Sequence, residues 1–229
     1  MPSYRRASLP AGMPELLIAC ALVAYNALLN RWPPFHGPAY VPMNVAAGFV
    51  LVAVAVSGLD LSFDRIGFAG GFAPAVPGLA AGALLAAPLF FLARSRSRAH
   101  LIADARATPD DVVFRTLVRI PIGTALFEEV LFRGVLLGAL LDEGKTIAVA
   151  GSAVAFGLWH IEPARLMARM NDRSVTPTIV ATVAVTFVAG IALAVLRIAS
   201  GGLALPVALH GSVNALANLA SRQALRSTF

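Results

Sequence analysis

Charged side chains are scarce in this sequence. Asp, Glu, Lys and Arg make up 13% of its 229 residues, which is about half of their share in an average globular chain. Cysteine is scarcer still, because Cys20 stands alone, and a single thiol excludes a scaffold stapled by disulfides. Hydrophobic residues account for 58% of the chain, which excludes intrinsic disorder. A soluble fold could not bury this much apolar surface without exposing large patches, so the composition predicts an integral membrane protein.

Apolar stretches of the length that crosses a bilayer, about 20 residues, recur along the whole chain. They are Pro14–Asn30, Met43–Leu59, Ala75–Ala93, Val112–Leu141, Thr146–His160, Pro177–Ala199 and Leu203–Ala220. We therefore predict an all-α, polytopic transmembrane helical bundle of seven to eight spans with a buried polar cavity. Residues 1–110 would form the N-terminal spans and a basic loop, and residues 111–222 the core of one integrated membrane domain.

Basic residues give the chain a net charge of +6, and almost all of them lie between the apolar stretches. Because Lys and Arg collect at the cytoplasmic ends of membrane spans, we interpret them as membrane-flanking charges and expect membrane lipids, and no nucleic acid, as partners. With seven spans, ten arginines share one face of the membrane: Arg31, Arg94, Arg96, Arg98, Arg106, Arg165, Arg169, Arg173, Arg222 and Arg226. Five basic residues share the other: Arg5, Arg6, Arg65, Lys145 and Arg197. This asymmetry predicts a multi-pass protein whose loops Arg94–Asp111 and Glu162–Thr176 face the cytoplasm.

Two glutamates, one arginine and two histidines lie deep inside or at the end of apolar stretches, where they are costly. Glu128, Glu129 and Arg133 lie in the fourth stretch, His160 ends the fifth, and His210 lies in the middle of the last. An ionisable group near the bilayer centre costs at least about 2.5 kcal/mol on insertion scales. We therefore expect these side chains to face the interior of the bundle and to meet one another there.

The spacing of these residues separates their roles. Glu129 and Arg133 are four residues apart on one helix face, which predicts an ion pair. Glu128 is turned by about 100° on the same helix and would be left free. His210 and Asn214 are again four residues apart, so their side chains point into one volume.

Each of these features also has a plainer interpretation. A lone histidine at a helix end, like His160, is more often an interfacial or capping residue, and His210 with Asn214 could be hydrogen-bonding glue between helices. Their co-occurrence with two buried glutamates favours a functional site. We interpret Phe156 and Trp159 as packing residues, and Glu162 as a solvated loop residue.

A free carboxylate, two histidines and an amide suit the hydrolysis of an amide bond. Glu128 with a histidine can activate a water molecule as general base, while the second histidine and the amide of Asn214 donate hydrogen bonds to a developing oxyanion. The same carboxylate and the two histidines could instead hold Zn²⁺, with water in the fourth position.

Three motifs together resemble those of the CPBP family of intramembrane endopeptidases. This family contains type II CAAX prenyl proteases and bacteriocin-processing or immunity proteins. Glu128-Glu129-x-x-x-Arg133 matches the first motif, Phe156-x-x-x-His160 the second and His210-x-x-x-Asn214 the third. They cover about Ile120–Ala220 in the family's order, and Leu61–Phe68 looks like the family's region before the core. The first two spans add no specific support.

The resemblance implies an intramembrane endopeptidase acting on a membrane-associated protein or peptide, without metal. Glu128 would be the base and would share its water with His160, Glu129 and Arg133 would support them, and His210 with Asn214 would form the oxyanion hole. The bacterial character of the sequence places it in a plasma membrane, with the active site opening to the cytoplasmic side. If zinc were used instead, its ligands would be Glu128, His160 and His210.

Two other classes of function remain open. A catalytically silent membrane scaffold or immunity factor could use the same polar cluster for packing. A proton-coupled small transporter could use it as a relay, but such folds are built from inverted repeats, and no internal repeat is visible in the sequence.

Overall fold

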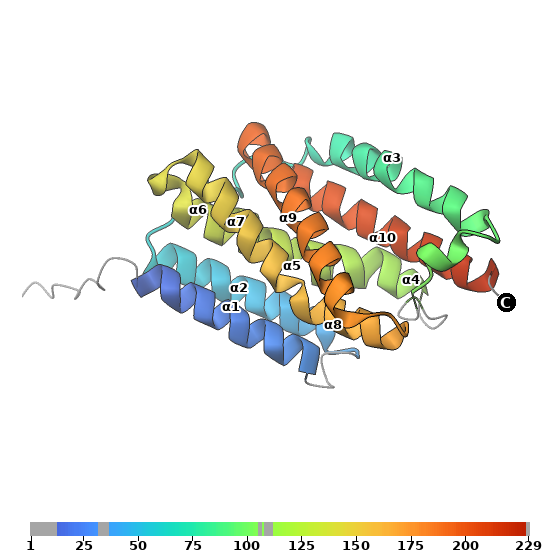
Figure 1. Cartoon of the computed structure of the whole chain (residues 1–229). Helices are drawn as coiled ribbons and strands as arrows, with labels where there is room; N and C mark the ends of the chain where they lie inside the picture. The colour runs from blue at the N-terminus through green and yellow to red at the C-terminus, as the bar shows by residue number, and fades with distance from the viewer. Residues whose placement is uncertain (1–12, 32–36, 105–106, 108–111, 228–229) are drawn as a thin grey trace, which may run out of the picture.

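The computed structural model describes residues 13–31, 37–104, 107 and 112–227, and every regular element within these ranges is helical (Figure 1). The long helices are α1 (Met13–Arg31), α2 (Tyr40–Gly58), α3 (Ala75–Arg94), α7 (Lys145–Trp159), α9 (Val175–Ser200) and α10 (Ala204–Ser227). Shorter pieces are η2 (Ala99–Leu101) and α8 (Ile161–Met170). The predicted all-helical bundle is therefore confirmed.

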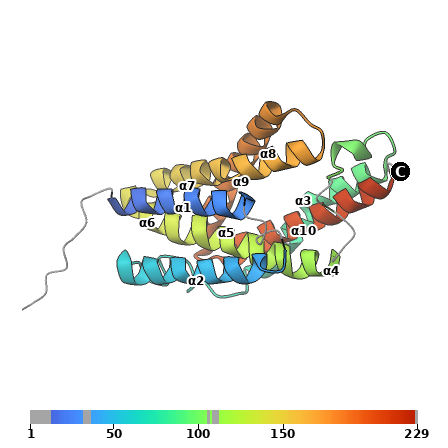
Figure 2. The ribbon, with the colours of Figure 1, turned by 90° about the horizontal axis from the view of Figure 1, so that it is seen from below.

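A continuous helical rod from residue 112 to 143 lies at the centre of the bundle. Its successive segments are α4 (Val112–Phe114), η3 (Arg115–Leu126), α5 (Phe127–Glu129), η4 (Val130–Leu136), α6 (Leu137–Leu140) and η5 (Leu141–Glu143). The segments η3 and η4 are π-helical, a winding that is rare and is often found at functional sites. The rod contacts α2, α7, α9 and α10 (Figures 1 and 2), so its side chains meet those of four neighbouring helices.

Four helices of the described chain are long and apolar enough to cross a membrane. They are Tyr40–Gly58, Ala75–Arg94, Lys145–Met170 and Val175–Ser200. Large apolar side chains cover their outer faces, among them Phe49, Leu84 and Val185, each more than half exposed. Such a surface suits contact with acyl chains and is unusual in a soluble monomer. The total of seven to eight spans stays a prediction.

Contacts between distant segments show which helix ends lie together. At one end, Arg173 donates hydrogen bonds to the carbonyls of His100 and Ala103, and the backbone N–H of Asp104 donates to Ser221. At the opposite end, Arg65 pairs with Asp142 at 2.5 Å, and Arg197 donates to the carbonyls of Asp64 and Arg65. This grouping agrees with spans that cross the bundle in alternating directions, which is how the basic residues were assigned to the two faces of the membrane. Arg5, Arg6 and Arg106 lie outside the described residues.

Helix α3 fixes the position of α10 through two glycines one turn apart. A Cβ atom added to Gly78 would lie 2.6 Å from the carbonyl oxygen of Leu205, and one added to Gly82 would lie 2.9 Å from that of Leu209. Small residues with this spacing allow two membrane helices to approach closely. Because α10 carries His210 and Asn214, the close packing of α3 sets the depth of these two side chains in the bundle.

Two details of the sequence interpretation are wrong. The segment Glu162–Thr176, expected as a loop, contains helix α8, which buries Ala164 and Ala168 against the bundle. Glu162 is in the first turn of α8 and pairs with Arg31 and Arg165, so it is not a solvated loop residue. The search for apolar stretches missed this helix because α8 is amphipathic, and its charged residues interrupt the apolar pattern of the sequence.

Candidate active site

Glu129 is bonded through one of its two oxygens in a buried polar cluster, and its Oε2 atom has no hydrogen-bond partner among the described residues. Its Oε1 atom lies 3.2 Å from Nη1 of Arg133 and 2.8 Å from Nδ1 of His210. Both Glu129 and Arg133 are completely buried, and Nη2 of Arg133 donates to the carbonyl of Gly190 in α9. The ion pair predicted from the four-residue spacing is present, and His210 joins it from α10.

Glu128 has a different environment on the same turn of the rod. Its Oε1 atom accepts a hydrogen bond from the indole N–H of Trp159 at 3.2 Å. Its Oε2 atom is buried, has no hydrogen-bond partner among the described residues and lies 3.8 Å from Nε2 of His210. One carboxylate oxygen is therefore held in place by α7 while the other faces the imidazole without engaging it.

The ring of Phe156 connects the two histidines. The centroid of the His160 ring lies 4.6 Å from that of Phe156 and the centroid of the His210 ring 5.8 Å, both edge to face. The guanidinium carbon of Arg133 lies 4.0 Å from the same ring centroid, within the range of a cation–π contact. Phe156 packs as predicted, and it also holds the cation and both imidazoles in one neighbourhood.

The protonation pattern of each imidazole follows from its partner. Nδ1 of His160 lies 2.7 Å from the carbonyl oxygen of Phe156, which can only accept, so Nδ1 carries the proton and Nε2 is left as the free acceptor. Nδ1 of His210 likewise donates to Glu129, and Nε2 of His210 is the atom that faces Glu128. His160 is half-buried, and no hydrogen bond or ion pair joins it to Glu128 among the described residues.

Asn214 lies one helical turn after His210. Its side chain is half-buried and makes no hydrogen bond to any described residue. It is not part of the bonded cluster. The structure therefore brings Glu128, Glu129, Arg133 and His210 into direct proximity, and it leaves His160 and Asn214 at the edge of the group.

The first two helices contribute polar residues that sequence reasoning missed. The amide of Asn26 in α1 donates to the carbonyl oxygen of Trp159 at 2.6 Å, which holds the backbone of the residue whose indole binds Glu128. The hydroxyl of Tyr25 donates to the completely buried Asn44 in α2 at 2.8 Å. The available signal was the presence of Asn26 and Asn44 within apolar stretches, where a polar side chain needs a partner.

Trp159 does more than the packing that was predicted for it, because its indole N–H also binds Glu128. Its ring packs as expected, with its centroid 5.6 Å from that of Phe132. A buried indole N–H needs an acceptor, and the hydrogen bond to Glu128 supplies one.

The zinc alternative is not decided by this arrangement. Among the described residues, no group of three His, Cys, Asp or Glu side chains that could hold a metal ion is found. Nδ1 of His210 is engaged by Glu129 and Nδ1 of His160 by a backbone carbonyl, and such contacts leave Nε2 as the nitrogen that could bind a metal. Whether activity depends on metal stays a prediction.

Residues 111–216 match the family model described as type II CAAX prenyl endopeptidase Rce1-like. The match covers a little under half of the chain, and it includes every residue from Glu128 to Asn214 that the motifs singled out. The resemblance drawn from the three motifs is thereby confirmed. The family is one of proteases, and together with the four apolar helices it identifies an integral membrane protein. No curated protein and no solved structure matches the chain.

Proposed function

Because residues 111–216 match a family of endopeptidases, we propose that the chain is an intramembrane endopeptidase. It hydrolyses a peptide bond of a membrane-associated protein or peptide by means of activated water. The observation that carries the proposal is the state of Glu128, a buried carboxylate with one oxygen anchored by Trp159 and the other unpartnered beside His210.

Glu128 acts as the general base in this reaction and shares the attacking water with His160. The free Nε2 of His160 is a second acceptor for that water. The hydroxyl group of the water joins the scissile carbonyl carbon, the C–N bond then breaks, and the proton taken up from the water passes to the leaving amine. General acid–base transfer of this kind contributes about 10²- to 10⁴-fold to a rate.

His210 and Asn214 stabilise the oxyanion that forms on the carbonyl oxygen. Because Nδ1 of His210 donates to Glu129, the donor toward the substrate is Nε2, which must also carry a proton. The unengaged amide of Asn214 supplies the second donor.

A comparison of membrane proteomes tests the proposed activity. Cells with the active protein should contain at least one membrane-associated protein with a new terminus, which is absent when the chain is deleted. Glu128→Gln should behave as the deletion, because it removes the base and about 10²-fold or more of the rate. Glu143→Gln, at an exposed glutamate of the same rod, is the matched control and should retain cleavage. A Glu128→Gln protein that folds and still generates the new terminus would show that the cluster serves a scaffold and not a protease.

The site opens to the cytoplasm in this proposal. The ten-to-five distribution of basic residues supports this orientation. A single cysteine at the exposed Ser97, in a Cys20→Ser background, should resist a membrane-impermeant thiol reagent in intact cells and react after lysis. Labelling in intact cells would show that the orientation is opposite to the proposed one, and it would leave the proposed chemistry unaffected.

A further inference from the structure

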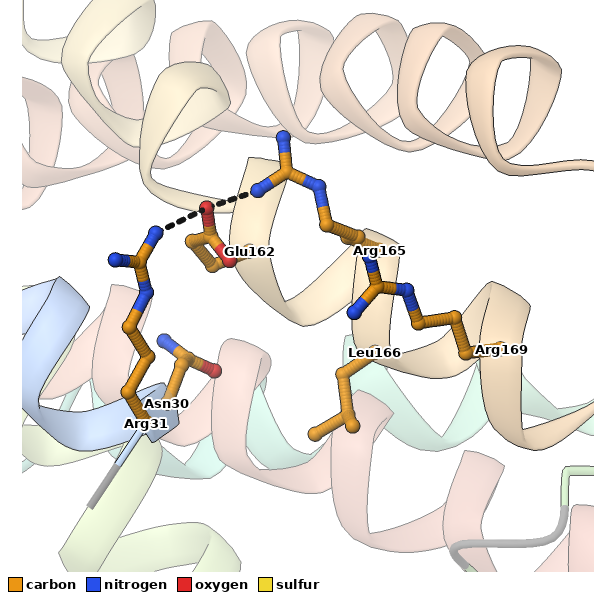
Figure 3. Close-up of a pocket in the computed structure, with 6 residues that line it drawn as sticks. All are labelled: Asn30, Arg31, Glu162, Arg165, Leu166 and Arg169. Carbon is orange, nitrogen blue, oxygen red and sulfur yellow. Dashed lines mark hydrogen bonds and ion pairs between the residues drawn. The ribbon is translucent and has the colours of Figure 1, made fainter.

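A pocket of about 320 Å³ opens between the end of α1 and the first turns of α8, outside the buried cluster (Figure 3). Its lining is unusual for so apolar a chain, because most of it is charged. The lining residues are Asn30, Arg31, Glu162, Arg165, Leu166 and Arg169.

The pocket has more positive than negative charge. Oε1 of Glu162 accepts from Nη1 of Arg165 and lies 3.5 Å from Nη2 of Arg31, so one carboxylate orients two guanidinium groups. Arg169, one turn beyond Arg165, extends back toward them (Figure 3) and has no ion pair or hydrogen bond with any described residue. Three arginines against one glutamate leave a formal charge of +2, which one bound anion would balance in part.

The position of the pocket indicates the source of that anion. Arg31 is the last residue of α1, and arginines at the ends of apolar helices lie at the level of the lipid headgroups. Helix α8 turns Ala164 and Ala168 toward the bundle and presents its arginines outward, as an amphipathic helix does at a membrane surface. Leu166 adds an apolar wall beside the charges. Basic pockets between membrane helices are suited to anionic headgroups.

We propose that this pocket binds the phosphate group of an anionic phospholipid. The guanidinium groups of Arg31, Arg165 and Arg169 donate to the phosphate oxygens, and Leu166 borders the glycerol and the first part of an acyl chain. Arginine suits this role because its planar fork matches the oxygens of a phosphate. This binding is independent of whether the buried cluster hydrolyses peptides.

The pocket is close in the chain to the proposed active site. Helix α8 begins directly after His160, and Asn26, one turn before the pocket in α1, holds the carbonyl of Trp159. A phosphate bridging Arg31 and Arg169 would therefore fasten α1 to α8 beside the residues that position Glu128.

Direct lipid binding tests the proposal without any measurement of activity. The full-length protein in detergent is titrated with phosphatidylglycerol and, separately, with phosphatidylcholine, each carrying a fluorescent acyl chain. The wild type should bind phosphatidylglycerol more tightly. The double variant Arg31→Gln/Arg169→Gln should lose about 30-fold in this affinity, the expected effect of two arginines near an anionic headgroup, while the Glu162–Arg165 pair remains intact.

The control is the double variant Arg96→Gln/Arg98→Gln, which removes the same charge from exposed positions on the loop after α3. It should bind phosphatidylglycerol as the wild type does. An equal loss in both double variants would overturn the proposal, as would unchanged binding by Arg31→Gln/Arg169→Gln. Displacement of the lipid by millimolar inorganic phosphate would show that the pocket takes free phosphate instead. If the double variant fails to fold, Arg169→Gln alone gives the test, because Arg169 is exposed and makes no ion pair or hydrogen bond with a described residue; the loss of affinity should then be about fivefold.

Discussion

Glu128 and Glu129 are adjacent in the sequence, but they lie in two differently built halves of the site. Glu129 is completely buried and meets two cationic or protonated partners, Arg133 and His210. Glu128 meets one neutral donor, the indole of Trp159, and its Oε2 atom lies 3.8 Å from Nε2 of His210. The Oε2 atoms of both glutamates have no hydrogen-bond partner among the described residues. The first environment joins a carboxylate to a buried guanidinium and an imidazole at hydrogen-bond distance, and the second holds a carboxylate by one neutral donor, with an imidazole beyond hydrogen-bond distance.

The difference follows from helix geometry. Successive residues of a helix are separated by about 100° around its axis, so the two carboxylates point toward different neighbours. Glu129 meets Arg133 on its own helix and His210 in α10, while Glu128 accepts from Trp159 at the end of α7 and lies 3.8 Å from the other nitrogen of His210. In the proposed function, one member of a pair of identical residues stabilises the fold through an ion pair, and the other acts as the base.

Loss of the charge on Glu129 is the largest change that we expect in stability. Glu129→Gln leaves Arg133 buried without its counter-ion, and breaking a buried ion pair in this way costs about 3–5 kcal/mol. Thermal unfolding in detergent should show a clearly lower Tm than for the wild type. Glu128→Gln is the matched control and should leave Tm nearly unchanged. Equal shifts in the two variants would remove the distinction between the two halves.

Removal of the Asn214 amide tests the half of the site that is proposed to act on the substrate. Asn214→Ala should lower kcat/KM by about 10²- to 10³-fold, the usual loss for one oxyanion-hole donor. The Tm should not change, because the side chain makes no hydrogen bond to any described residue. Asn218→Ala, one turn further along α10, is the control and should keep its activity. A comparable loss in both variants would assign the effect to the helix and not to the amide.

A smaller effect is expected when Trp159 loses its N–H group. Trp159→Phe keeps an aromatic ring against Phe132 but leaves Oε1 of Glu128 without its donor. Hydrogen bonds to charged groups contribute about 1.5–3 kcal/mol, so kcat should fall by about 10- to 10²-fold, with KM little changed. Phe127→Leu, which trims the same aromatic cluster, measures the packing contribution alone. If the two variants lose kcat equally, Trp159 acts only through packing.

Chelation should produce the smallest effect of all. In the proposed mechanism Glu128 is a base and not a ligand, so activity should survive dialysis against a chelator, and purified protein should contain well under one zinc per chain. Metal analysis and activity are measured on the same samples. Stoichiometric zinc that is lost together with activity, and restores it when added back, would require the metal-dependent mechanism.

Local periodicity predicted a large part of this architecture. The apolar stretches predicted the helices, and the four-residue spacing predicted the Glu129–Arg133 pair, because both depend on residues within a few turns of one another. The same reasoning missed α8, whose charged face interrupts the apolar pattern, and it found no role for the first two spans.

The amino-acid sequence by itself determined that this chain is helical, that it belongs in a membrane and which polar residues it carries inside. Only the tertiary structure decided how these residues are paired. His210 meets Glu129 across 81 residues of sequence, Trp159 meets Glu128 across 31, and Asn26 meets Trp159 across 133. The physical reason is that the helical repeat sets neighbours within one helix, whereas partners on different helices depend on how closely the helices pack, as Gly78 and Gly82 allow between α3 and α10.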